Sequence, residues 1–193
     1  MQRAGAWTTV AVAGVVGAFS AMLMVGFVQT RTGQAMAGEK GGPIYAQLSS
    51  VATQAPKTTG PMVVKMESND AVSGIAHSDK EKTEDVVVKT AGVYFVVAAA
   101  QVGRSKGVGE DYVDLWIRQN GKDVDNSNTR QSIKDSNFTG VLVCQGIAEC
   151  KAGDVFTVAA SVSATDQGLG LIATTPRGEP AIPSIIFSMY KIN

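Results

Sequence analysis

The chain has 193 residues, enough for one domain with a hydrophobic core and a terminal segment beside it. Lysine and arginine number 17, as do aspartate and glutamate, so the formal net charge is zero. This balance lacks the basic excess typical of nucleic-acid-binding proteins and argues against a nucleic-acid partner.

The first feature along the chain is an uncharged stretch between Arg3 and Arg31. As a helix these 27 residues would reach roughly 40 Å, more than the roughly 30 Å hydrocarbon thickness of a bilayer. Residues 1–30 are therefore predicted to be a single transmembrane helix, with residues 6–28 in the lipid. A cleaved signal peptide is the alternative, because Ala35-Met36-Ala37 fits a signal peptidase site, but the apolar run is long for a signal.

Small residues recur within this stretch. Ala13, Gly17 and Ala21 fall on one helical face at four-residue spacing, which would let a partner helix approach closely. Insertion with the short N-terminus in the cytoplasm would place the C-terminal part outside it. We therefore expect a single-pass membrane protein whose C-terminal domain is extracytoplasmic, either periplasmic or extracellular.

Residues 31–42 are polar and glycine-bearing without periodicity and are interpreted as a linker. From residue 43 to 193, short apolar runs alternate with turn signals, a pattern typical of an antiparallel all-β sandwich or barrel. Eight strands are predicted, at residues 44–50, 62–66, 86–90, 93–102, 112–119, 138–148, 155–162 and 185–192.

The strand at 112–119 gives the clearest local pattern. Val113, Leu115 and Ile117 alternate with polar residues and Trp116, so one face should be buried and Trp116 should lie on the other. Trp116 is thus a candidate for a contact surface, or else an ordinary half-buried tryptophan. Asn120-Gly121 then predicts a two-residue hairpin turn.

Four stretches together resemble the jelly-roll superfamily that includes tumour necrosis factor and the globular head of complement component one-q: IYAQLSS, TAGVYFVVAAAQV, LWIRQNGKDV and KAGDVFTVAAS. The resemblance implies a ten-stranded, two-sheet jelly roll that commonly trimerises. It also implies that Tyr94 and Phe95 lie near the core or the threefold contact. Members of the family bind proteins or glycans and are generally not enzymes.

Residues able to perform chemistry are few. His77 is the only histidine, which excludes a multi-histidine metal enzyme, and no nucleophile elbow, phosphate loop or paired zinc motif is present. Asp123, Asp125 and Ser127 have the spacing of a calcium loop, but Asn128 and Lys134 replace its glycine and glutamate. We expect no enzyme activity, cofactor or metal.

The two cysteines, Cys144 and Cys150, present conflicting signals. In one straight strand their Cα atoms would be about 20 Å apart, too far for a disulfide. Two cysteines in an exported domain are nevertheless usually paired. We therefore expect a bulged loop at Gly146 that is closed by a disulfide between Cys144 and Cys150.

The sequence therefore predicts a non-enzymatic, membrane-anchored protein whose extracytoplasmic jelly roll associates with other proteins, as a structural or accessory subunit of a larger membrane complex. The alternative is a homotrimeric module that binds glycans or surface proteins.

Overall fold

The structure, a computed structural model, describes residues 41–193, and this part of the chain is all-β with no helix. Residues Gly42–Asn193 form one compact unit. The thirteen strands are β1 (Tyr45–Ser50), β2 (Met62–Val63), β3 (Ser68–Ser73), β4 (Ile75–Ala76), β5 (Val86–Val88), β6 (Gly92–Gly103), β7 (Val108–Gln119), β8 (Lys122–Asp123), β9 (Thr129–Asp135), β10 (Thr139–Cys150), β11 (Val155–Val162), β12 (Gly170–Leu171) and β13 (Ile185–Lys191).

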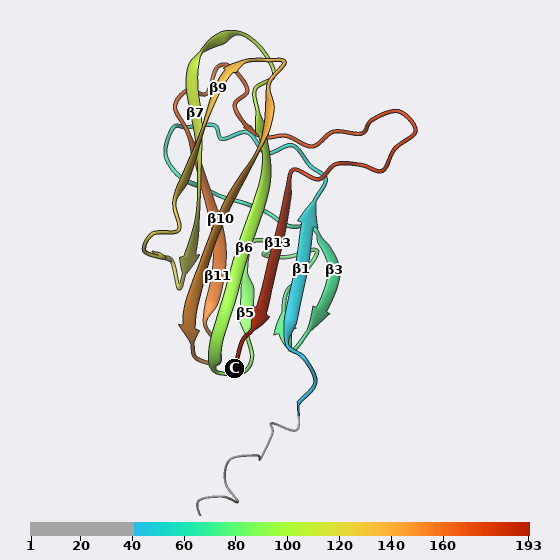
Figure 1. The fold of residues 1–193 in the computed structure, drawn as a ribbon, viewed down its shortest axis with the longest axis vertical. Helices are drawn as coiled ribbons and strands as arrows, with labels where there is room; N and C mark the ends of the chain where they lie inside the picture. The colour runs from blue at the N-terminus through green and yellow to red at the C-terminus, as the bar shows by residue number, and fades with distance from the viewer. Residues whose placement is uncertain (1–40) are drawn as a thin grey trace, which may run out of the picture. The chain divides into compact units, whose positions relative to one another are not determined.

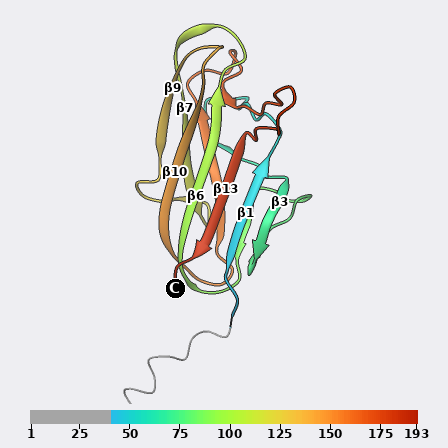
Figure 2. The same ribbon diagram turned by 45° about the vertical axis from the view of Figure 1, so that its right-hand side comes forward.

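The strands form two antiparallel sheets (Figures 1 and 2). Sheet A has the order β10-β6-β13-β1-β3, with β12 also pairing with β6. Sheet B has the order β4-β5-β11-β7-β8, with β2 on β11 and β9 on β7. In sheet A, β13, at the C-terminal end of the domain, pairs with β1, at its N-terminal end, and this pairing runs from Tyr45↔Tyr190 to Ser50↔Ile185.

The core lies between the two sheets, because alternate residues of each long strand point inward. On β6 the inward series runs from Tyr94 to Val102, and on β7 it comprises Val113, Leu115 and Ile117. The largest fully buried side chains include Tyr94, Phe156 and Phe187. Apolar burial of this kind supplies the main stabilising free energy of the sandwich.

The predicted hairpin turn is confirmed. Asn120 and Gly121 have φ values of 53° and 75°, and Gln119 pairs with Lys122 across the turn. Two successive residues at positive φ produce the twist that matches a β-hairpin, which explains the Asn-Gly sequence.

Each of the eight predicted strands corresponds to an observed one within a few residues at either end. Five of the observed strands are not predicted from the sequence: β3, β4, β8, β9 and β12. The main reason is composition: β3 is almost wholly exposed, and β9 buries only Ile133. Neither strand therefore shows the apolar alternation on which the prediction depended.

No helix in residues 41–193 is long and apolar enough to cross a membrane. The predicted anchor, its small-residue face at Ala13, Gly17 and Ala21, and nearly all of the predicted linker lie outside the described residues.

Candidate interaction surface

The outer side of sheet A, which faces away from the core, is the most distinctive surface of the domain. Four neighbouring strands of this sheet, β10, β6, β13 and β1, place outward side chains in register. Three successive rows read Val143–Ala99–Ile186–Ser49, Gln145–Val97–Ser188–Gln47 and Ile147–Phe95–Tyr190–Tyr45. None of these twelve residues is charged. We call this surface the apolar face.

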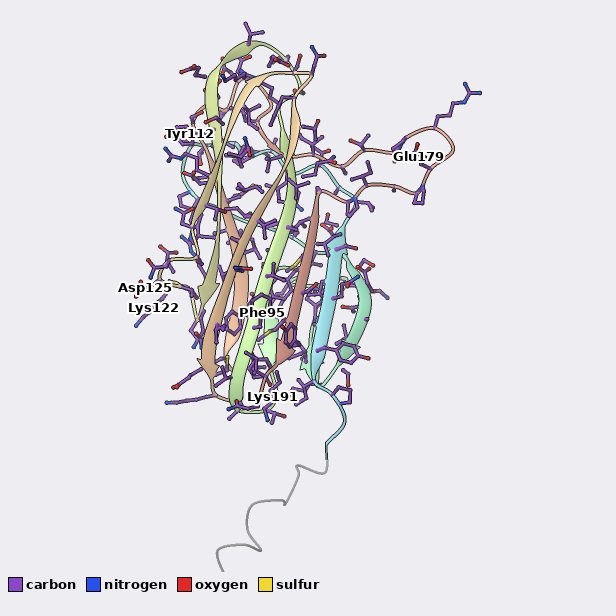
Figure 3. The ribbon with its side chains drawn as sticks, viewed as in Figure 1. Phe95, Tyr112, Lys122, Asp125, Glu179 and Lys191 are labelled. Atoms are coloured by element: carbon purple, nitrogen blue, oxygen red, sulfur yellow. The ribbon has the colours of Figure 1, made fainter. Side chains whose placement is uncertain are left out.

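The apolar residues of the face are accessible, most of all on β10. Val143 and Ile147 are 43% and 64% exposed, and Val141, which lies next to the face on the same strand, is 67% exposed. Tyr190 is half exposed, and its ring lies 5.3 Å from that of Phe95 on the neighbouring strand. Figure 3 shows Phe95 on β6, the second strand of the face. The surface therefore combines an aromatic pair with exposed aliphatic side chains.

Strand β10 adds a second property, because it forms the end of sheet A and runs for 12 residues. A long edge strand has backbone N–H and C=O groups without partners in its own sheet, and soluble proteins usually protect such edges with charge or proline. From Val141 to Ile147, β10 carries neither. This edge is suited to contact another polypeptide.

Three of the four side chains in the middle row of the apolar face are polar but uncharged. Within residues 41–193, the side chains of Gln145, Ser188 and Gln47 have no hydrogen-bond partner. An amide group both donates and accepts, so it can pair with an identical amide on another chain. These groups can give direction to a contact that is otherwise apolar.

Of the three predicted contact residues, only Phe95 lies on this surface. Tyr94 is fully buried and its hydroxyl donates a 2.7 Å hydrogen bond to the carbonyl of Thr90, so it lies in the core, which is one of the two places that the resemblance implied, and not on a contact surface. Strand alternation decides this, because neighbouring residues of β6 point to opposite sides of the sheet.

Trp116 does lie on the side of sheet B away from the core, as predicted, but it is only 8% exposed. Its Nε1 donates to Asp123 at 2.7 Å, and the guanidinium of Arg118 lies 5.2 Å from its ring. Trp116 is thus largely covered, which fits the alternative of an ordinary, partly buried tryptophan and not an exposed contact residue. Two hydrogen bonds hold the pKa of Asp123 below its ordinary value of 3.8, the one from Arg118 having the larger effect and the one from Trp116 the next.

The predicted disulfide is not formed. β10 runs from Thr139 to Cys150 without reversing at Gly146, and Cys144 and Cys150 are both free and buried. The two thiols face the core from one continuous strand, and the six residue steps between them correspond to roughly 20 Å. Burial, the dominant cause for each, raises the pKa of Cys144 to about 12 and that of Cys150 to about 11. Neither thiol is a nucleophile near neutral pH.

The remaining polar candidates have structural partners. His77 Nδ1 lies 2.7 Å from Asn69 Oδ1, and its Nε2 lies 3.1 Å from the carbonyl of Thr83. In the calcium-like loop, Ser127 is buried and donates to the carbonyl of Val124, while Asp123 is engaged as described above. Within residues 41–193, no group of three or more His, Cys, Asp or Glu residues is placed to hold a metal ion.

Of the comparisons with known proteins, the one with solved structures bears on the architecture. No protein-family model matches the sequence, and no curated protein is found to match it. Among solved structures, murine APRIL at pH 5.0 is similar, with a TM-score of 0.50 and 14% sequence identity over 78% of this chain and 100% of that chain. At this identity the likeness shows the fold alone. The shared fold is a jelly roll like that of tumour necrosis factor. The likeness does not assign the chain to the complement branch.

Proposed function

We propose that the protein is a non-enzymatic, membrane-anchored protein that presents its jelly roll outside the cytoplasm and binds other proteins, as a structural or accessory subunit of a larger membrane complex. The observation that carries the proposal is the apolar face of sheet A. Large exposed apolar surfaces are uncommon on soluble domains that work alone, and they usually mark a site of protein contact.

The chemistry of the face supports binding rather than catalysis. Its outward groups are aliphatic, aromatic, amide and hydroxyl side chains, which exclude water or form hydrogen bonds but supply no acid, base or activated nucleophile. Exposed aliphatic and aromatic groups spread over β10, β13 and β1 suit contact with another folded surface.

The membrane part of the proposal rests on the sequence. Residues 6–28 are long enough to span a bilayer, and the small residues Ala13, Gly17 and Ala21 would let a partner helix pack closely. A tether confines the domain to a layer near the membrane and raises its effective concentration toward other membrane proteins. A contact of modest intrinsic affinity would then suffice.

A photo-crosslinking experiment on the full chain tests this proposal. A photoreactive phenylalanine analogue replaces Ile147 on the apolar face or, as a control, Val63, which is 42% exposed on sheet B. After irradiation of native membranes, adducts to another polypeptide are expected from position 147 and not from position 63. Equal or absent adducts at both positions would reject the apolar face as the binding surface.

A second candidate is a homotrimer formed through the same face. It is favoured by the tumour-necrosis-factor-like fold, whose members commonly trimerise, and by the absence of charge from the three rows. Around a threefold axis identical residues of the three chains meet, so like charges there would repel, whereas neutral amides such as Gln145 can pair with their own kind. Adducts at position 147 that contain only this chain, with a threefold mass in mild detergent, would support this candidate over a heteromeric complex.

A further inference from the structure

An arm projects from the domain between β12 and β13. Its two legs are joined by paired hydrogen bonds between Thr174 and Ile182, with N···O distances of 3.0 and 2.8 Å, and we call residues 174–182 the arm. Beyond this bridge, the only internal hydrogen bond of the arm within residues 41–193 is from the Glu179 N–H to the carbonyl of Pro176. Figures 1 and 2 show the arm extending away from both sheets.

The base of the arm is fixed to the apolar face. Gln101 of β6 donates from Nε2 to the carbonyl of Ile172 at 2.7 Å and to the Thr174 hydroxyl, and its backbone N–H donates to Ser184. Gln101 lies directly opposite the exposed Val141 of β10. The arm is therefore a rigidly mounted extension beside the proposed association surface.

The tip of the arm is restrained as well. Gly178 has φ 80° at the third position of the turn that Pro176 begins, and Pro180 follows soon after. A glycine is required at such a position, and prolines reduce the entropy that the segment would lose on binding. The turn holds two opposite charges, Arg177 and Glu179, which are exposed and have no ion-pair partner within residues 41–193.

A concavity with the complementary arrangement lies on the other side of the domain. It has a volume of about 280 Å³ and is lined by Glu110, Asp111, Tyr112, Arg130, Ser132 and Lys134. We call it the β7–β9 pocket. Figure 3 shows Tyr112 on the side of the sandwich opposite to Glu179 of the arm.

Two of the charged groups in this pocket are already neutralised. Arg130 donates to both carboxylate oxygens of Asp114, at 2.7 and 2.8 Å, and its guanidinium lies 3.6 Å from the centre of the Tyr112 ring. Asp111 is paired with the buried Arg104 at 3.0 Å.

The two groups that remain are of opposite sign. Glu110 and Lys134 have no ion-pair partner within the described part of the chain. The pocket thus offers one free anion and one free cation, and the arm offers the same pair.

We infer that the arm of one copy docks in the β7–β9 pocket of a second copy, with Arg177 against Glu110 and Glu179 against Lys134. Because donor and acceptor sites lie on opposite sides of one domain, the contact is head-to-tail, and a rotation that closes would give a ring. The inference rests on the self-association proposed above as the second candidate function. It adds a contact separate from the apolar face.

Charge reversal on the full chain in mild detergent at low salt tests the pairing. Arg177→Glu and Glu110→Arg are each expected to raise the dissociation constant of the oligomer about three- to tenfold, since an attraction becomes a repulsion. The double variant is expected to restore affinity to near the wild-type value. Arg177→Glu with Glu67→Arg, the same acid-to-base change at an exposed site outside the pocket, is the matched control and should show no rescue.

Disulfide trapping gives an independent test. Glu179→Cys and Lys134→Cys together should form a covalent oligomer on mild oxidation, whereas each single variant should not form the head-to-tail ladder. The two native thiols should not interfere, because both are buried on β10. Trapping by the double variant would support the docking.

The outcomes separate the two proposals. A wild-type protein that is monomeric at all concentrations overturns both self-association and the docked arm. A wild-type oligomer that neither responds to charge reversal nor traps the cysteine pair overturns the docked arm alone and leaves the apolar face as the contact.

Discussion

Replacing Ile147 by Asp should separate association from folding. The Ile147 side chain is 64% exposed on the outer surface of β10, in the same row as Phe95 and Tyr190, so most of its surface becomes buried only in a complex. Complete burial of an isoleucine contributes about 1.5–3 kcal/mol, and the part still available here is roughly 1–2 kcal/mol. Since 1.4 kcal/mol is a factor of ten, the dissociation constant should rise about five- to thirtyfold per contact. Burial of the new carboxylate would add to that loss.

The assay is the concentration dependence of the mass of the complex in mild detergent, measured by analytical ultracentrifugation. Val63→Asp is the control, because it places the same charge at an outward site on sheet B. Both variants should lose a similar, small amount of thermal stability, about 1 kcal/mol or less, because each aspartate is unfavourable in a strand. Equal effects of the two substitutions on assembly would refute the assignment of the apolar face as the contact.

Three further predictions concern the domain itself. Burial raises the pKa of the two thiols of β10 to about 12 and about 11, so the folded chain retains protons that the unfolded chain releases. Below about pH 9 these thiols should therefore not affect the free energy of unfolding, which should fall as pH rises from there toward 12. Urea titrations at several pH values would measure this dependence. Labelling of the folded protein by a thiol reagent at pH 8 would contradict the buried positions of the thiols. The hydrogen bond from Arg118 contributes most, and that from Trp116 next, to lowering the pKa of Asp123. In a Trp7→Phe variant Trp116 is the only tryptophan, so its emission should report the protonation of Asp123 and change only below pH 3.8. A midpoint above that value would count against the interaction. Gly121→Ala should cost roughly 1–2 kcal/mol in urea unfolding, because φ is 75° there although the space beside it is open, and an unchanged midpoint would mean that the turn does not constrain the hairpin.

The strands of this domain could be predicted where local pattern and tertiary burial coincide. β7 is an example, because Val113, Leu115 and Ile117 alternate with residues of the other face and an Asn-Gly turn follows at once. β3 and β9 could not be found in this way. Their residues are held by pairing with β1 and β7, and so few of them are buried that the sequence retains no periodic signal.

Only part of the apolar face can be predicted from the sequence. In the run from Val93 to Val102, apolar residues stand at successive positions and not only at alternate ones. The sequence therefore indicates a strand covered on both sides but does not say which residues face the core. The sequence therefore does not distinguish Tyr94 from Phe95. The register of β6 with its two neighbours distinguishes them, because it buries Tyr94 and aligns Phe95 with Ile147 and Tyr190.

The sequence by itself determined the all-β class, most of the strands and the hairpin turn, because backbone preference and alternation are local properties that a short segment carries alone. Only the tertiary structure decided that both thiols remain free, that Trp116 is covered by Arg118, and that the outward residues of four strands form one uncharged face. These facts depend on which strands become neighbours and in what register. Pairing between segments as distant as β1 and β13 is set by the packing of the whole core, which no local pattern encodes.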